Sequence, residues 1–186
     1  VDFLDEAGEV IYVEERLGSN LLWLGAMDVP IPTTATLKLS TVYTPTETSE
    51  ELFGYGTVQP TKIEMNGELF IDAHLPIDTD DPFAPLMDPP FATKKFPFVA
   101  GQPVNIEITV DWRNRQGLQA VAQNFIFGIE ADAALGDQNI ATAVENAKNS
   151  DLAIVVVGTN SKVESEGLDR KNLDLPGRQN ELVEAV

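Results

Sequence analysis

The chain has no cysteine and only one histidine among its 186 residues. The absence of cysteine excludes disulfide bonds, thiolate metal sites and a cysteine nucleophile. The lone histidine, His74, cannot form a histidine-rich metal site by itself, and its place at the end of an expected strand favours a structural role.

Basic residues are also scarce, because 12 Lys and Arg stand against 30 Asp and Glu, for a net charge of −18. A surface of this sign repels phosphate groups, which argues against nucleic acid or an anionic membrane as a partner. No apolar run approaches the roughly 18–20 residues that a membrane-spanning helix needs. The first residues, VDFLDEAGEV, are acidic where a signal peptide would be basic. The compartment, secreted or cytoplasmic, stays open.

Both ends of the chain suggest a fragment of a longer protein. The sequence starts without Met, and it stops at Val186 inside a helical pattern, GRQNELVEAV, that has no C-terminal cap.

Residues 1–133 predict a mainly β structure, an antiparallel β-sandwich. Short alternating or β-branched runs are separated by spacers rich in proline. The pair Asn66-Gly67, flanked by strand formers, predicts a two-residue type I′ hairpin. The expected strands lie in segments 9–15, 20–25, 34–45, 61–73, 102–112 and 123–130.

The longest spacer, residues 76–98, is expected to be a loop. Loops of this length are often functional, although an irregular excursion at a sheet edge is equally compatible. It carries Phe83, Phe91 and a group of aspartates that includes Asp80 and Asp81. Since this group lacks the spacing of a calcium loop, we expect no metal.

Residues 134–186 predict an incomplete α/β domain, because the apolar period changes there. Ile140, Ala143, Val144 and Ala147 follow helical spacing. The run DLAIVVVG predicts a strand buried on both faces of a parallel sheet, and a second helix is expected from near Pro176.

An acidic segment, VESEGLDR, follows the apolar run. Ligands bind at the carboxyl ends of parallel strands, so Glu164 and Glu166 are placed where a site would lie. Either carboxylate could act as a general acid. On spacing alone, a solvated loop is the favoured interpretation, because acidic loops are common on acidic proteins.

The stretch DLAIVVVGTNSKVESEGLDRKNLDLPGRQNELVEAV resembles the C-terminal α/β domain of glycoside hydrolase family 3. The resemblance implies that the loop donates the general acid/base of a retaining mechanism, with Glu166 in that role and Glu164 as the alternative. Arg170 is then a candidate to orient Asp169 or a substrate hydroxyl. The nucleophile of that family is an Asp on a barrel domain outside this chain, so the chain alone is expected to be inactive.

The stretches TATLKLSTVYTPTETSEELFGYGTVQPTKIEMNGELFIDA and FVAGQPVNIEITVDW resemble the protective-antigen-type (PA-type) β-sandwich that one branch of the family inserts before this strand. In enzymes that carry it, the sandwich can lean a loop over the active-site entrance. The resemblance thus makes Phe83 and Phe91 candidate substrate contacts. Trp23 and Trp112 lie inside strand patterns and are expected in the core.

The resulting hypothesis is part of a retaining, exo-acting β-glycosidase. Its expected partners are a small oligosaccharide or β-glycoside and the barrel and remaining α/β portions of the same enzyme. No cofactor is expected, and a homo-oligomer is compatible with the sequence. The alternatives are a carbohydrate-binding module without catalysis and a structural or dimerisation domain.

Overall fold

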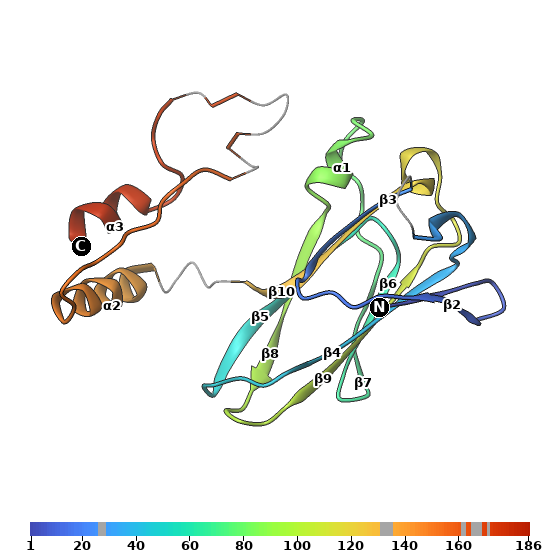
Figure 1. Ribbon diagram of the computed structural model, residues 1–186, viewed down its shortest axis with the longest axis horizontal. Helices are drawn as coiled ribbons and strands as arrows, with labels where there is room; N and C mark the ends of the chain where they lie inside the picture. Colours follow the sequence, from blue (N-terminus) through green and yellow to red (C-terminus); the bar gives the residue numbers. More distant parts are fainter. Residues whose placement is uncertain (26–28, 131–135, 161–162, 165–168, 171) are drawn as a thin grey trace. The chain divides into compact units, whose positions relative to one another are not determined.

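The computed structural model describes residues 1–25, 29–130, 136–160, 163–164, 169–170 and 172–186. The chain forms two compact units, Val1–Glu130 and Ala131–Val186 (Figure 1). Each unit is described separately.

The first unit is a sandwich of two antiparallel sheets, which confirms the predicted fold class. The six-stranded sheet has the order β2-β1-β4-β9-β6-β7, and the four-stranded sheet has the order β3-β10-β5-β8. The strands are β1 (Asp2–Leu4), β2 (Val10–Val13), β3 (Asn20–Leu24), β4 (Thr36–Tyr43), β5 (Ser49–Gly56), β6 (Thr61–Met65), β7 (Glu68–Ala73), β8 (Phe91–Phe98), β9 (Val104–Asp111) and β10 (Ala122–Glu130). Short 3₁₀ turns lie at Ile31–Thr33 and Gly117–Ala120, and a one-turn helix, α1, at Ala84–Met87.

The core forms between the sheets because alternate side chains of each strand point inward. In β4, Leu37 and Leu39 are buried, while Lys38 and Ser40 between them are exposed. The predicted hairpin is present as well. Asn66 and Gly67 connect β6 to β7 with φ of 53° and 80°, both positive as a type I′ turn requires.

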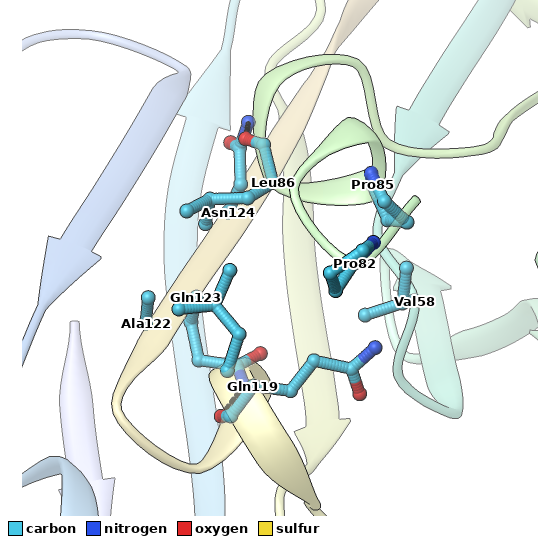
Figure 2. A pocket seen from close by; sticks show the side chains of 9 residues that line it. Val58, Pro82, Pro85, Leu86, Gln119, Ala122, Gln123 and Asn124 are labelled. Atoms are coloured by element: carbon cyan, nitrogen blue, oxygen red, sulfur yellow. Dashed lines mark hydrogen bonds between the residues drawn. The ribbon is translucent and has the colours of Figure 1, made fainter. Parts of the chain in front are cut away.

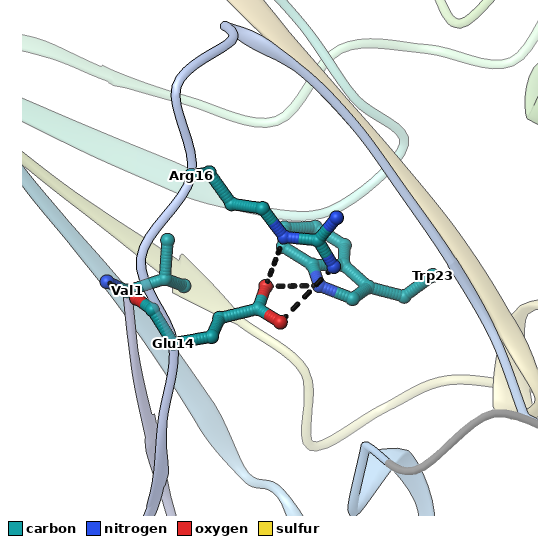
Figure 3. A network of polar contacts seen from close by, with 4 residues as sticks. All are labelled: Val1, Glu14, Arg16 and Trp23. Atoms are coloured by element: carbon teal, nitrogen blue, oxygen red, sulfur yellow. Dashed lines mark hydrogen bonds and ion pairs between the residues drawn. The ribbon is translucent and has the colours of Figure 1, made fainter.

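A polar contact joins the two sheets beside this core (Figure 3). The indole Nε1 of Trp23, on β3, donates a 2.7 Å hydrogen bond to Oε1 of Glu14, which directly follows β2. Arg16 binds both oxygens of the same carboxylate, at 2.9 and 3.0 Å. The hydrogen bond to Glu14 raises the pKa of the Arg16 guanidinium. The buried indole N–H is thus satisfied by a carboxylate that is itself paired.

The prediction of a loop over residues 76–98 is wrong from Ala84 onward, where the chain forms first α1 and then β8. The sequence did not indicate β8 because it contains Pro97 and the pair Lys94-Lys95, and these residue types are uncommon in a central strand. However, within the described part of the chain β8 pairs with β5 alone, so it is an edge strand, where proline and lysine are tolerated. Phe91 is therefore the first residue of a strand and not a loop residue.

The second unit contains the two expected helices, α2 (Gly136–Lys148) and α3 (Gln179–Ala185). The expected buried strand between them is not formed in this structure. Residues 152–160 lie in no helix or strand, and Leu152, Ile154 and Val156 are 76%, 81% and 87% exposed. A strand exists through hydrogen bonds to a neighbour, and no strand in the described residues pairs with this segment.

Candidate functional site

The base of the acidic loop is closed by the side chain of Gln179, the first residue of α3. Its Oε1 accepts the Gly158 N–H at 2.7 Å, and its Nε2 donates to the Gly158 carbonyl at 2.9 Å. The same Nε2 also donates to the Pro176 carbonyl, at 2.9 Å. One amide thus binds the backbone on both sides of the loop, which begins after Gly158 and returns at Pro176.

Arg178, the preceding residue, ties α3 to the start of α2. Its guanidinium lies 2.6 Å from an Asp137 oxygen and donates from Nε to Glu181 at 2.8 Å. Hydrogen bonds to Glu181 and then to Asp137 raise the pKa of Arg178, and the bond to Arg178 lowers the pKa of Glu181. Gly136 leaves room for this contact, since a Cβ there would lie 2.7 Å from Nη1 of Arg178.

Within the loop, the structure brings Glu164 and Arg170 together. Arg170 Nε lies 3.5 Å from a Glu164 oxygen, with 24% and 53% of the two side chains exposed. Among the described residues, the contact found for Arg170 is with Glu164, and the expected pairing with Asp169 is not found. Glu166 lies outside the described residues.

Phe83 occupies the N-cap position of α1 and is 58% exposed. Asp81 orders this turn, because its Oδ1 accepts the Phe83 N–H at 2.9 Å. Asn124 of β10 holds α1 on the sandwich by donating from Nδ2 to the Leu86 carbonyl at 2.8 Å. Figure 2 shows α1 seated over β10, with Pro82 and Leu86 among the residues that line the small cavity between them. The exposed side chain of Phe83 therefore lies on a helical turn that a hydrogen bond holds against β10.

Phe91 lies over two glycines of the adjacent strand β5. A Cβ on Gly54 would stand 2.3 Å from the Phe91 ring, and one on Gly56 would stand 3.0 Å from it. The ring fills the space that side chains would take at both positions and is 44% exposed. The two glycines, which weaken a strand signal, are explained by this aromatic ring.

Other candidates from the sequence have structural roles. Nε2 of His74 lies 3.1 Å from the Val58 carbonyl. Trp23 and Trp112 are 1% and 2% exposed, so the expectation that both belong to the core is confirmed. Among the described residues, no group of three or more His, Cys, Asp or Glu could hold a metal ion. No described helix has both the length and the apolar character to cross a membrane.

The chain was compared with known protein families, curated proteins and solved structures. Residues 34–186 match the model of the glycosyl hydrolase family 3 C-terminal domain. The match covers most of the chain, and the chain belongs to this family.

The similar proteins are glycosidases. The chain is 29% identical over 153 residues to a β-glucosidase of Rhizobium radiobacter, which covers 80% of the chain and 18% of the relative. It is 38% identical over 96 residues to a β-glucosidase of Kluyveromyces marxianus, covering 50% and 11%. The crystal structure of that enzyme in complex with glucose superposes with a TM-score of 0.71 at 26% identity, covering 100% of this chain and 22% of the other. The chain therefore spans about a fifth of the length of these proteins.

Gln179 and Arg178 were not identified as functional residues from sequence. Both stand in the motif LPGRQ, which carried the family resemblance, but a motif does not show which backbone groups its side chains bind. That assignment required the contacts to Gly158 and Asp137.

Proposed function

We propose that this chain supplies the general acid/base of a retaining, exo-acting β-glycosidase, and that Glu166 is the acid/base. The observation that carries the proposal is the family match, which runs through the acidic loop to Val186. In such a mechanism one carboxyl group protonates the leaving oxygen, and a second, about 5–5.5 Å from the first, attacks the sugar. The attacking carboxylate, an Asp of the barrel domain, belongs to the longer protein.

Glu164 is the alternative acid. Its ion pair with Arg170 suggests a role in orientation instead of proton transfer. The two side chains form an ion pair at 3.5 Å, longer than a charge-assisted hydrogen bond. We propose that Arg170 orients the loop or a substrate hydroxyl through this pair, while Glu166 transfers the proton.

The purified chain of 186 residues should not hydrolyse an aryl β-glucoside. The physical reason is that a retaining mechanism needs two carboxyl groups on opposite sides of the sugar, and this chain is proposed to supply one. Release of nitrophenol from nitrophenyl β-glucoside measures the activity, with a protein that includes the barrel domain as the positive control. Turnover by the short chain would contradict the proposed division of roles. Binding of glucose or cello-oligosaccharides without catalysis in any longer form would favour a carbohydrate-binding module instead.

The sandwich is proposed to shape substrate entry through Phe83 and Phe91. The support is that each ring is about half exposed although the backbone beneath it is fixed, by Asn124 under α1 and by the glycines of β5 under Phe91. Exposed aromatic rings on rigid supports provide contact area at a small entropic cost.

Replacing Gly54 by alanine tests the Phe91 proposal, because the new methyl group would overlap the ring. We expect a loss of about 1–3 kcal/mol in the free energy of unfolding, the usual cost of overpacking. In the Phe91→Ala background the same change should cost far less, since the clash is gone. Urea unfolding measures the four stabilities. In the longer protein, Gly54→Ala and Phe91→Ala should each change KM for cello-oligosaccharides more than KM for an aryl glucoside, and equal changes would argue against a substrate contact.

A further inference from the structure

The amide of Gln179 is matched to the backbone of one residue. It accepts from the N–H of Gly158 and donates to the carbonyl of the same residue, at 2.7 and 2.9 Å. The partners are 21 residues apart in the chain. An amide is the side-chain group that offers an acceptor and a donor side by side, so neither a carboxylate nor a lysine could make both contacts.

Gln179 is itself held from two directions. The extra hydrogen bond from its Nε2 to the Pro176 carbonyl fixes the turn that enters α3. The neighbouring Arg178 pairs with Asp137 of α2 and with Glu181 of α3, so the start of α3 is tied to the start of α2. The amide therefore binds Gly158 from a fixed support.

Gly158 takes part in this contact through its backbone N–H and carbonyl, and the contact does not depend on the absence of a side chain. Among the residues that the structure describes, no atom outside the chain neighbours lies within 4 Å of the position that a Cβ would take, and the φ of Gly158 lies outside the positive range that disfavours other residues. An alanine at this position keeps both the N–H and the carbonyl that Gln179 binds. This gives a matched control in which the sequence changes and the contact stays.

We propose that Gln179 is a positioning residue for proton transfer. By binding the backbone at Gly158 and at Pro176, it fixes the two ends of the segment that carries Glu164, Glu166 and Asp169, and the acid depends on those fixed ends for its approach to the leaving oxygen. The inference rests on the proposed function, because it assigns the loop's acid to catalysis.

The test uses the longer protein that contains this chain, with the variants Gln179→Ala, Gln179→Glu and Gly158→Ala. Hydrogen exchange at the Gly158 amide should speed up about 10-fold or more in Gln179→Ala, since one net hydrogen bond is lost. The kcat/KM for a substrate with a poor leaving group, such as cellobiose, should fall about 10–100-fold. The kcat/KM for an activated dinitrophenyl glucoside, whose leaving group needs little proton donation, should fall much less. Gly158→Ala should keep slow exchange at the amide of residue 158, because both backbone groups that Gln179 binds are retained.

Gln179→Glu adds a readout that a purely structural role would not move. At neutral pH the carboxylate still accepts from the Gly158 N–H but faces the Gly158 and Pro176 carbonyls without a donor. Protonation restores a donor, so the activity of this variant relative to the unaltered protein should rise as the pH falls.

Two failures can be told apart. Unchanged exchange at Gly158 in Gln179→Ala, or a loss of kcat/KM that is the same for both leaving groups, would overturn the positioning role. If Glu166→Ala then still shows its dependence on the leaving group, the proposed function stands without this inference. If Glu166→Ala shows none, the proposed function fails first.

Discussion

Replacing Glu166 by alanine in the longer protein should slow hydrolysis of substrates with poor leaving groups by about 10²–10⁴-fold, the usual contribution of a general acid. The reason is that a sugar alkoxide leaves slowly unless a proton reaches the glycosidic oxygen as the bond breaks. An activated aryl leaving group departs as a stable anion, so its release should be affected far less. The measurement is a plot of log kcat/KM against leaving-group pKa, which should become steeper in the variant.

Glu164→Ala is the matched control, since it removes an acid two residues away and leaves Arg170 without the contact seen here. We expect a smaller loss that does not depend on the leaving group. A steep dependence in Glu164→Ala together with a flat one in Glu166→Ala would exchange the two roles. A flat dependence in both would contradict the proposal that this loop carries the acid.

In the second half of a retaining reaction a base takes a proton from the water that attacks the glycosyl-enzyme intermediate. Without that base the attack is slow, so the Glu166→Ala variant should accumulate this intermediate on an activated substrate. Added azide, a nucleophile that needs no deprotonation, should restore turnover of an activated substrate. This rescue would separate a lost acid/base from a misfolded active site, because a distorted site would not respond to azide.

The parts of the fold that were predictable from sequence are those governed by local patterns. The hairpin followed from Asn66-Gly67, which adopts the positive φ values that few other pairs accept. The buried face of β4 followed from its alternation. The family resemblance followed from the motifs around VESEGLDR, and the family match confirms it.

What the sequence could not provide are the features that depend on distant partners. Strand β5 contains Gly54 and Gly56, which look like a turn until Phe91 of β8 is seen to cover them. Strand β8 carries the lysines and proline that an edge position tolerates, and the edge is a property of the whole sheet. Likewise, the contact from Gln179 to Gly158 spans the acidic loop, and no local pattern encodes it. In the apolar run 152–157 the local pattern predicts a strand that the structure lacks. A strand also needs a neighbour to pair with, which local composition does not provide.

The largest stability effect is expected in the sandwich core, at Trp112. Its ring is 2% exposed and meets Phe3 and Trp23 edge to face, with centroids 5.9 and 5.5 Å apart. The guanidinium of Arg115 lies 5.0 Å from the same ring, and it donates to the Ile31 carbonyl at 2.7 Å. Burial lowers the pKa of that guanidinium, because removal from water disfavours the charged form. The hydrogen bond to Ile31 and the contact with the Trp112 ring offset part of this cost.

Trp112→Ala should therefore lower the free energy of unfolding by about 3–5 kcal/mol, as for other buried aromatic residues. The cost combines lost apolar burial, an unfilled cavity and the loss of the cation–π contact with Arg115. Urea unfolding followed by circular dichroism measures it, and the fluorescence of Trp23 reports on the same core.

Phe83→Ala is the control, because its ring is 58% exposed and the change should stay within about 0.5 kcal/mol. If Trp112→Ala cost no more than this control, Trp112 would not be the centre of the core. Should both variants keep the sandwich folded, only Phe83→Ala is expected to alter oligosaccharide hydrolysis in the longer protein, which separates a core aromatic residue from one displayed to substrate.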